Sequence, residues 1–145
     1  MDDEVAKKAQ KQFGLISREQ AVELGLSKSA LNRRVKTKQF LRYLPGVYRM
    51  PGTVESPHQR IMGACLCIGP SALASHETAA YLWNLEGHPP RVVELSAPRT
   101  TTRVLKDALI HLPRDHATVT KVLRGAIPTT HLARTLVDLA ATTES

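Results

Sequence analysis

The sequence predicts an α+β fold in two parts: short helices closed by a β-hairpin, then a small α+β domain with an antiparallel sheet. Three observations favour this fold class. Helix-capping residues surround a glycine turn near the N-terminus, two β-prone runs flank a Pro-Gly pair, and later apolar helical segments alternate with short strand-like runs. A chain of 145 residues can form one domain of ordinary size, or a small domain and a modest second one. We expect residues 1–54 to form one and residues 55–145 the other.

The first part begins with a helix expected over residues 2–12, which Gly14 ends. Ser17 and Gln20 then occupy the two positions of a capping box, so a second short helix is expected to start after Ser17. Gly25 stands where a left-handed C-cap belongs and ends that helix.

A third helix follows directly. Ser27 can cap it, and Leu26 and Leu31 stand at the positions of a hydrophobic staple. Two short helices joined by a tight glycine-containing turn predict a helix-turn-helix. Leu31 and Val35, four residues apart, mark the buried side of the third helix, and Arg34 lies towards that side. The opposite side then presents Ser29, Asn32, Arg33 and Lys36, with Lys28 at its edge.

The run from residue 40 to residue 50 predicts a β-hairpin around Pro45 and Gly46. Arg42 and Arg49 stand on opposite arms of it. A basic hairpin directly after such a helix is typical of the wing of a winged helix-turn-helix. The alternative is a simple hairpin that closes the sheet of a small domain, and both interpretations can hold together.

Positive charge is concentrated in the first part. Residues 1–54 contain eleven Lys and Arg against five acids, whereas residues 56–145 contain nine against seven, and Glu55 accounts for the remainder of the net charge of +7. No acid occurs from Leu24 to Val54. A long run of one sign favours a polyanion such as nucleic acid, although a solvated surface is the alternative.

The third helix favours DNA over an ordinary amphipathic surface helix, which would normally include Glu or Asp. Arg and Asn can pair with base edges in the major groove, and Lys and Ser suit phosphates. We therefore predict a recognition helix with a basic wing. The predicted DNA-binding residues are Arg18, Ser27, Lys28, Ser29, Asn32, Arg33, Lys36, Lys38, Arg42, Tyr48 and Arg49.

The second part predicts helices with an antiparallel sheet. Ser56 and Gln59 form a capping box for a helix that Gly69 stops, and Ser75 begins a helix expected to end at Gly87. Strands are expected over residues 91–97, 108–112 and 118–123, and a last helix over residues 130–141.

No catalytic or metal-binding constellation is expected. Cys65, Cys67, His58 and His76 invite a zinc interpretation, but on a helix the two thiols point about 200° apart, and their spacing is not the usual ligand spacing. Buried structural cysteines are the preferred interpretation. Carboxylates are scattered rather than clustered for metal-dependent nuclease chemistry. We expect no cofactor and no enzyme activity.

His111 and His116 flank a predicted turn. We expect solvated histidines there rather than a general base with its orienting acid.

Several segments resemble AbiEi-type antitoxins along nearly the whole chain, and the best motifs are Leu-Pro-Gly-Val-Tyr and Arg-Thr-Leu-Val-Asp-Leu-Ala. The segments are residues 14–21, 25–27, 44–48, 75–80, 92–98, 127–130 and 134–140. The resemblance implies a transcriptional regulator of a type IV toxin–antitoxin operon that binds its own promoter. It also implies a nucleotidyltransferase-like toxin, countered without a stable complex. The alternative is the interaction and regulatory part of a larger nuclease-fused protein.

Composition sets the expected compartment and assembly. The sequence contains no run of 18 apolar residues, so we expect no membrane span. The polar N-terminus is unlike a secretory signal. Two cysteines are too few for a disulfide framework, so we expect a reducing cytoplasm. A homodimer is an open expectation, because palindromic operators suit paired recognition helices.

Overall fold

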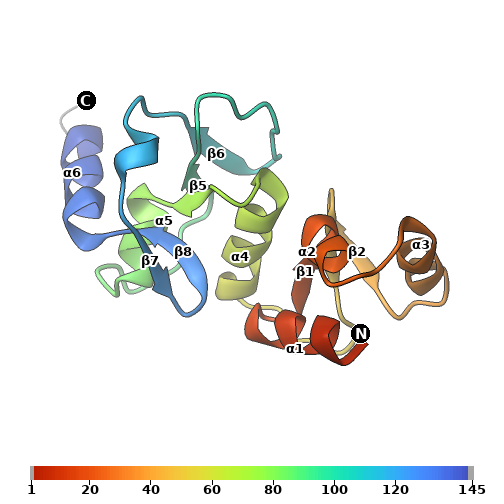
Figure 1. Ribbon diagram of the computed structural model, residues 1–145. Helices are drawn as coiled ribbons and strands as arrows, with labels where there is room; N and C mark the ends of the chain where they lie inside the picture. The colour runs from red at the N-terminus through yellow and green to blue at the C-terminus, as the bar shows by residue number, and fades with distance from the viewer. Residues whose placement is uncertain (1, 144–145) are drawn as a thin grey trace. The chain divides into compact units, whose positions relative to one another are not determined.

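The computed structural model describes residues 2–143 and contains both helices and sheets, which confirms the predicted α+β class (Figure 1). The chain divides into two compact units, Met1–Cys67 and Ile68–Ser145.

The first unit combines three helices with a small sheet, and a fourth helix follows. Its sheet is three-stranded and antiparallel, in the order β1-β3-β2. The elements in this part are α1 (Asp2–Lys11), β1 (Leu15–Ser17), α2 (Arg18–Glu23), α3 (Lys28–Lys36), β2 (Leu41–Leu44) and β3 (Val47–Arg49). In this chain order a β-hairpin, β2 and β3, directly follows the third helix. β1 was not predicted, because three residues are too short to show alternation.

The predicted caps of α2 and α3 are confirmed. Ser17 Oγ accepts a hydrogen bond from the backbone N–H of Gln20 at 3.1 Å, and Gln20 Oε1 accepts one from the backbone N–H of Ser17 at 3.1 Å. Gly25 has a φ of 101°, which only glycine adopts readily, so it ends α2 as expected. Ser27 Oγ accepts from the backbone N–H of Ala30 at 3.1 Å and caps α3.

One buried cluster holds these helices on the sheet. Val5 of α1, Ile16 of β1 and Leu31 of α3 are all almost completely buried in it. Leu26 is 3% exposed and Leu31 2%, so both staple residues lie in the same core, as predicted. This packing fixes which side of α3 faces inward.

The next helix, α4 (Pro57–Ile68), begins after the domain boundary expected at residue 54. The Gln59 side chain donates to the carbonyl of Phe13 at 2.9 Å, and Gly63 lies so close to Tyr43 that a Cβ would be 2.6 Å from its Cε2. Most of α4 therefore packs with the first unit, which extends to Cys67 instead of residue 54. The capping box expected here is only half formed. Ser56 Oγ accepts from the backbone N–H of Gln59, but Gln59 Nε2 donates to Phe13, and Gln59 Oε1 accepts no hydrogen bond from the described residues.

The second unit has a five-stranded sheet in the order β6-β5-β4-β8-β7 (Figure 1). Its elements are β4 (Leu73–Ala74), α5 (His76–Leu82), β5 (Val93–Ser96), β6 (Ala108–His111), a 3-10 turn (His116–Thr118), β7 (Lys121–Arg124), β8 (Ile127–Thr130) and α6 (Leu132–Thr143). The expected antiparallel sheet is wrong, because this sheet is mixed: β5 pairs with β6 and β4 with β8 in parallel. The long connection over residues 97–107 returns the chain to the start of β5, which a short hairpin turn cannot do.

The helix expected to reach Gly87 ends at Leu82. Asn84 adopts a φ of 62° directly after it. The backbone N–H groups of Asn84 and Leu85 donate to the carbonyls of Tyr81 and Ala80, at 3.0 and 2.8 Å. This is a Schellman ending with asparagine in the position usually held by glycine. The sequence pattern missed it because it relied on the next glycine.

A candidate nucleic-acid interface

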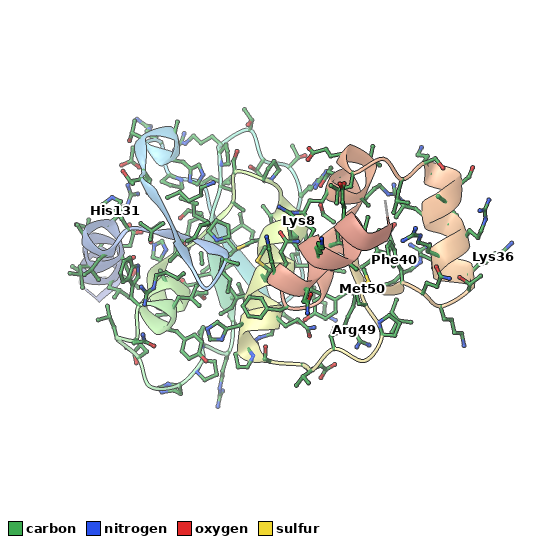
Figure 2. The ribbon with its side chains drawn as sticks, turned by 60° about the horizontal axis from the view of Figure 1, so that its bottom comes forward. Lys8, Lys36, Phe40, Arg49, Met50 and His131 are labelled. Carbon is green, nitrogen blue, oxygen red and sulfur yellow. The ribbon has the colours of Figure 1, made fainter. Side chains whose placement is uncertain are left out.

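The side of α3 opposite the core is open to solvent. Ser29, Asn32, Arg33 and Lys36 are exposed, whereas Leu31 is buried and Val35 packs against the core. Figure 2 shows Lys36 on α3 with its side chain directed away from the sheet. The orientation expected from helical periodicity is therefore the one that the structure has.

The hairpin adds a cation beside this face. Arg42 of β2 is exposed and, with side chains of α3, lines one open hollow. The lining residues are Ser29, Asn32, Arg33, Val35, Lys36 and Arg42. The hollow thus gathers three cations, an amide and a hydroxyl. Such a set can bind phosphates and base edges.

No carboxylate neutralises these cations within the described part of the chain. Lys28, Arg33 and Lys36 form no ion pair with any residue between 4 and 142. Arg34 is different, because its guanidinium lies 5.4 Å from the centre of the Phe40 ring. That contact agrees with its expected place towards the core.

Arg49 lies on the other side of the hairpin from Arg42. In the ladder, Arg42 is opposite Tyr48 and Leu41 is opposite Arg49, and opposed residues share a face. Arg42 and Arg49 therefore point to opposite faces, and Arg49 lies well away from Lys36 in Figure 2.

The neighbours of Tyr43 also place Arg49 on that other side. Burial raises the pKa of Tyr43, Glu55 raises it further, and the positive charges of Arg60 and Arg49 act against this. Arg49 is thus close enough to influence a ring that packs on Gly63 of α4. It does not join the hollow beside α3.

Tyr48 does not lie at the candidate interface. Its side chain is 3% exposed, and its ring lies 5.8 Å from that of Phe40 in the core. The prediction that Tyr48 contacts DNA is therefore corrected. The residue lies opposite the exposed Arg42 in the ladder, but the sheet there is covered by the packed helices.

The remaining predicted contacts, apart from Arg49, are exposed residues of the first unit. Arg18 begins α2 with an exposed side chain, and its backbone N–H donates to the carbonyl of Gly46 at 2.8 Å in the hairpin turn. Ser27 and Lys28 begin α3, and both are exposed. Lys38 follows α3 with an exposed side chain and a φ of 61°.

Two histidines occupy places that the sequence did not predict. His111 lies in β6, and its Nε2 is 3.1 Å from Glu94 Oε1. His116 is only 7% exposed, and its Nε2 lies 2.7 Å from the carbonyl oxygen of Ser71. Neither is a solvated turn histidine, because strand pairing and the packing of the 3-10 turn bring both inward. Cys65 and Cys67 are buried thiols, as expected.

A charged cluster in the second unit was missed by the sequence analysis. Arg134 Nη1 and Nη2 donate to both carboxylate oxygens of Asp115, at 2.7 and 3.1 Å, while Nε donates to Asp138 Oδ1 at 2.8 Å. Asp115 and Asp138 both raise the pKa of Arg134, and Arg134 lowers that of Asp115. Only the i, i+4 spacing of Arg134 and Asp138 was a usable signal.

A basic helix, exposed beside a β-hairpin and packed on two further helices, defines the first unit as a helical DNA-binding domain. Residues 3–51 match a protein-family model described as "Transcriptional regulator, AbiEi antitoxin". The expected resemblance to AbiEi-type antitoxins is thereby confirmed over this segment. No curated protein matches the chain. None of the helices within residues 2–143 has the length and apolar character needed to cross a membrane.

Proposed function

We propose that the protein is a DNA-binding repressor of its own operon. The observation that supports this most strongly is the exposed face of α3, which joins Arg42 in one acid-free hollow. The family of residues 3–51, a family of transcriptional regulators, supports it independently.

In this proposal α3 enters the major groove. Asn32 and Arg33 read base edges, because an amide pairs with adenine and a guanidinium with guanine. Side chains around them hold phosphates and fix the register of the domain on the duplex. These phosphate-binding residues are Arg18, Ser27, Lys28, Ser29, Lys36, Lys38 and Arg42, with Arg49 on the far side of the hairpin as a more distant contact.

The regulator would act as the antitoxin of a type IV system. The family description of the first unit names an antitoxin, and the motifs of the second unit resemble the same family. The partner would be a nucleotidyltransferase-like toxin, countered without a stable complex. The protein would act without enzyme activity in the cytoplasm.

Binding to DNA from upstream of its own gene tests the repressor proposal. Fluorescence anisotropy should show tighter binding to this DNA than to a scrambled duplex of the same composition. Affinity should fall steeply with salt, by a slope of about 0.9 in log–log form for each phosphate contact. Equal affinity for both duplexes would sink the claim of sequence-specific recognition.

Two substitutions on α3 distinguish residues that recognise bases from residues that bind phosphates. Arg33→Ala should reduce discrimination between the two duplexes by about 1–3 kcal/mol. Lys36→Ala should weaken binding to both duplexes alike and lower the salt slope by about one unit. Arg114→Ala, which removes an exposed cation from the second unit, is the matched control and should change neither. If Arg33→Ala and Lys36→Ala both bind like the parent chain, α3 is not the recognition helix.

A second candidate function is self-association through α6. Leu132, Leu136 and Val137 are 41%, 49% and 63% exposed on this helix, an unusual exposure for large apolar residues. A second copy of the chain is the proposed occupant, because two recognition helices suit a palindromic DNA site. Sedimentation of the full chain and of Leu136→Glu tests this. A parent chain that stays monomeric at all concentrations would end the dimer proposal.

A further inference from the structure

Two imidazoles and a carboxylate meet in the second unit, although no motif in the sequence joins them. His76 is the first residue of α5, Glu94 lies on β5 and His111 on β6. β5 and β6 run parallel and side by side, and α5 packs against β5 (Figure 1). One nitrogen or oxygen from each of the three side chains lies within 4.8 Å of the other two.

The two rings are stacked rather than merely close. Their centres are 3.8 Å apart, and their planes differ by 17°. His111 Nε2 also lies 3.1 Å from Glu94 Oε1. An ordinary His–Glu hydrogen bond explains His111 and Glu94, but it gives no reason for a second imidazole over the first.

The backbone holds His76 in an unusual position. Its φ is 54°, in the left-handed region that residues other than glycine seldom adopt. Such conformations persist where surrounding structure enforces them, and they concentrate at binding sites. This backbone conformation places the His76 ring beside His111.

Neighbouring polar groups orient the set. Ser75 Oγ lies 2.9 Å from His76 Nδ1, and the backbone N–H of Glu77 donates to Glu94 Oε2 at 3.2 Å. Metal-binding histidines usually make a hydrogen bond through their other ring nitrogen, and metal-binding carboxylates are usually hydrogen-bonded too. Both arrangements are present here before any ion binds.

An open hollow adjoins the cluster. His76 and Glu94 line this hollow, which leaves room for a water molecule or another ligand.

We propose that His76, Glu94 and His111 form a binding site for a Zn²⁺ ion, with a fourth coordination position open to the hollow. Two imidazoles, one carboxylate and an open position are a common zinc ligand set. Ligands at about 2.0–2.1 Å from a tetrahedral ion lie about 3.4 Å apart, so small side-chain rotations would close the set. The stacked rings would splay as both turn towards the ion.

This site shares only His76 with the zinc arrangement considered from the sequence, which also involved Cys65, Cys67 and His58. It also replaces the expectation that the chain binds no metal. Because its ligands come from three separate elements, a bound ion would link α5, β5 and β6. An ion that binds only the folded chain raises its stability.

Titration of the full-length chain with Zn²⁺ alone, followed by calorimetry, tests the site. The parent chain should bind one equivalent, and its thermal midpoint should rise. Glu94→Gln and His111→Asn should each lose stoichiometric binding. Ser75→Ala, which removes an orienting hydroxyl, should weaken binding about 10–100-fold. His58→Asn, which replaces a histidine of the first unit, is the matched control and should bind Zn²⁺ like the parent.

Two further measurements on the parent chain keep the test decisive if a variant misfolds. With Co²⁺ as the probe, a nitrogen and oxygen site gives d–d bands without the strong near-ultraviolet thiolate band that Cys65 or Cys67 would produce. Imidazole nitrogen NMR should show His76 and His111 shifting on addition of Zn²⁺. A thiolate band, shifts confined to other histidines, absence of binding, or unchanged binding in Glu94→Gln and His111→Asn would overturn the proposal.

Discussion

One set of cations in each unit is placed in a way opposite to the other. On α3 of the first unit, Lys28, Arg33 and Lys36 are exposed and make no ion pair with residues 4–142. In the second unit, Arg134 bonds two carboxylates, and the guanidinium of Arg124 lies 4.4 Å from the centre of the Trp83 ring. The first set is available to an outside partner, while the second is used within the fold.

This difference separates two kinds of motif residue. The segment of residues 134–140 is one of the two motifs on which the resemblance expected from the sequence rested, and it lies outside the matched residues 3–51. In the structure, Arg134 and Asp138 pair with each other, and Thr135 Oγ1 donates to the carbonyl of His131 at 3.0 Å. Their contacts fix the start of α6 rather than present groups to solvent. A resemblance in sequence therefore does not by itself mark a binding residue.

The largest expected effect comes from removing the core under α3. Leu31→Ala should destabilise the first unit by about 2–5 kcal/mol, because it leaves a cavity at a residue that is 2% exposed. Urea unfolding measures the loss, and DNA binding should fall with it. If both units unfold together with an unchanged midpoint, the core assigned to α3 is wrong.

The next effect tests the comparison directly. Arg134→Met should cost about 1–3 kcal/mol, because Asp138 remains buried without its partner. DNA affinity should not change. Arg33→Met, the matched substitution on α3, should lower DNA affinity and leave stability within about 0.5 kcal/mol. The reverse pattern, measured by urea unfolding and anisotropy, would contradict the division between the two sets of cations.

The sequence could predict those features that depend on residues close together in the chain. The caps of α2 and α3 depend on residues three positions apart, so Ser17, Gln20 and Ser27 predicted them correctly. The exposed face of α3 followed from helical periodicity alone.

Long-range pairing could not be predicted in this way. β4 has two residues and joins β5 on one side and β8 on the other, so no local pattern marks it. The burial of Tyr48 could not be predicted either, because the local pattern does not show which face of the sheet an alternating strand turns towards the core. The His76, Glu94 and His111 cluster also arises only when α5, β5 and β6 assemble.

A smaller effect should follow from removing one cap of α3. Ser27→Ala deletes the oxygen that accepts from Ala30, so we expect a loss of about 1 kcal/mol. Ser29→Ala changes a nearby exposed serine of the same helix without removing that cap, and should cost less. Thermal unfolding compares the two. An equal loss in both variants would mean that the Ser27 cap adds nothing to the stability of α3.

The smallest effect concerns the exposed end of the Arg134 cluster. Arg134 lowers the pKa of Asp115 below its ordinary value of 3.8, chiefly through their hydrogen bonds. The ionised carboxylate therefore adds stability at pH above that value, and this contribution is lost as pH falls through the lowered pKa. Since the Asp115 side chain is 58% exposed, solvent screens the pair and the gain is slight.

Asp115→Asn should thus be slightly less stable than the parent at neutral pH, and the difference should shrink below pH 3.8 and in high salt. Urea midpoints at both pH values measure this. A difference in stability that does not shrink on acidification would contradict the pairing of Asp115 with Arg134 in solution. The stabilisation by a paired carboxylate must be lost once that carboxylate is protonated.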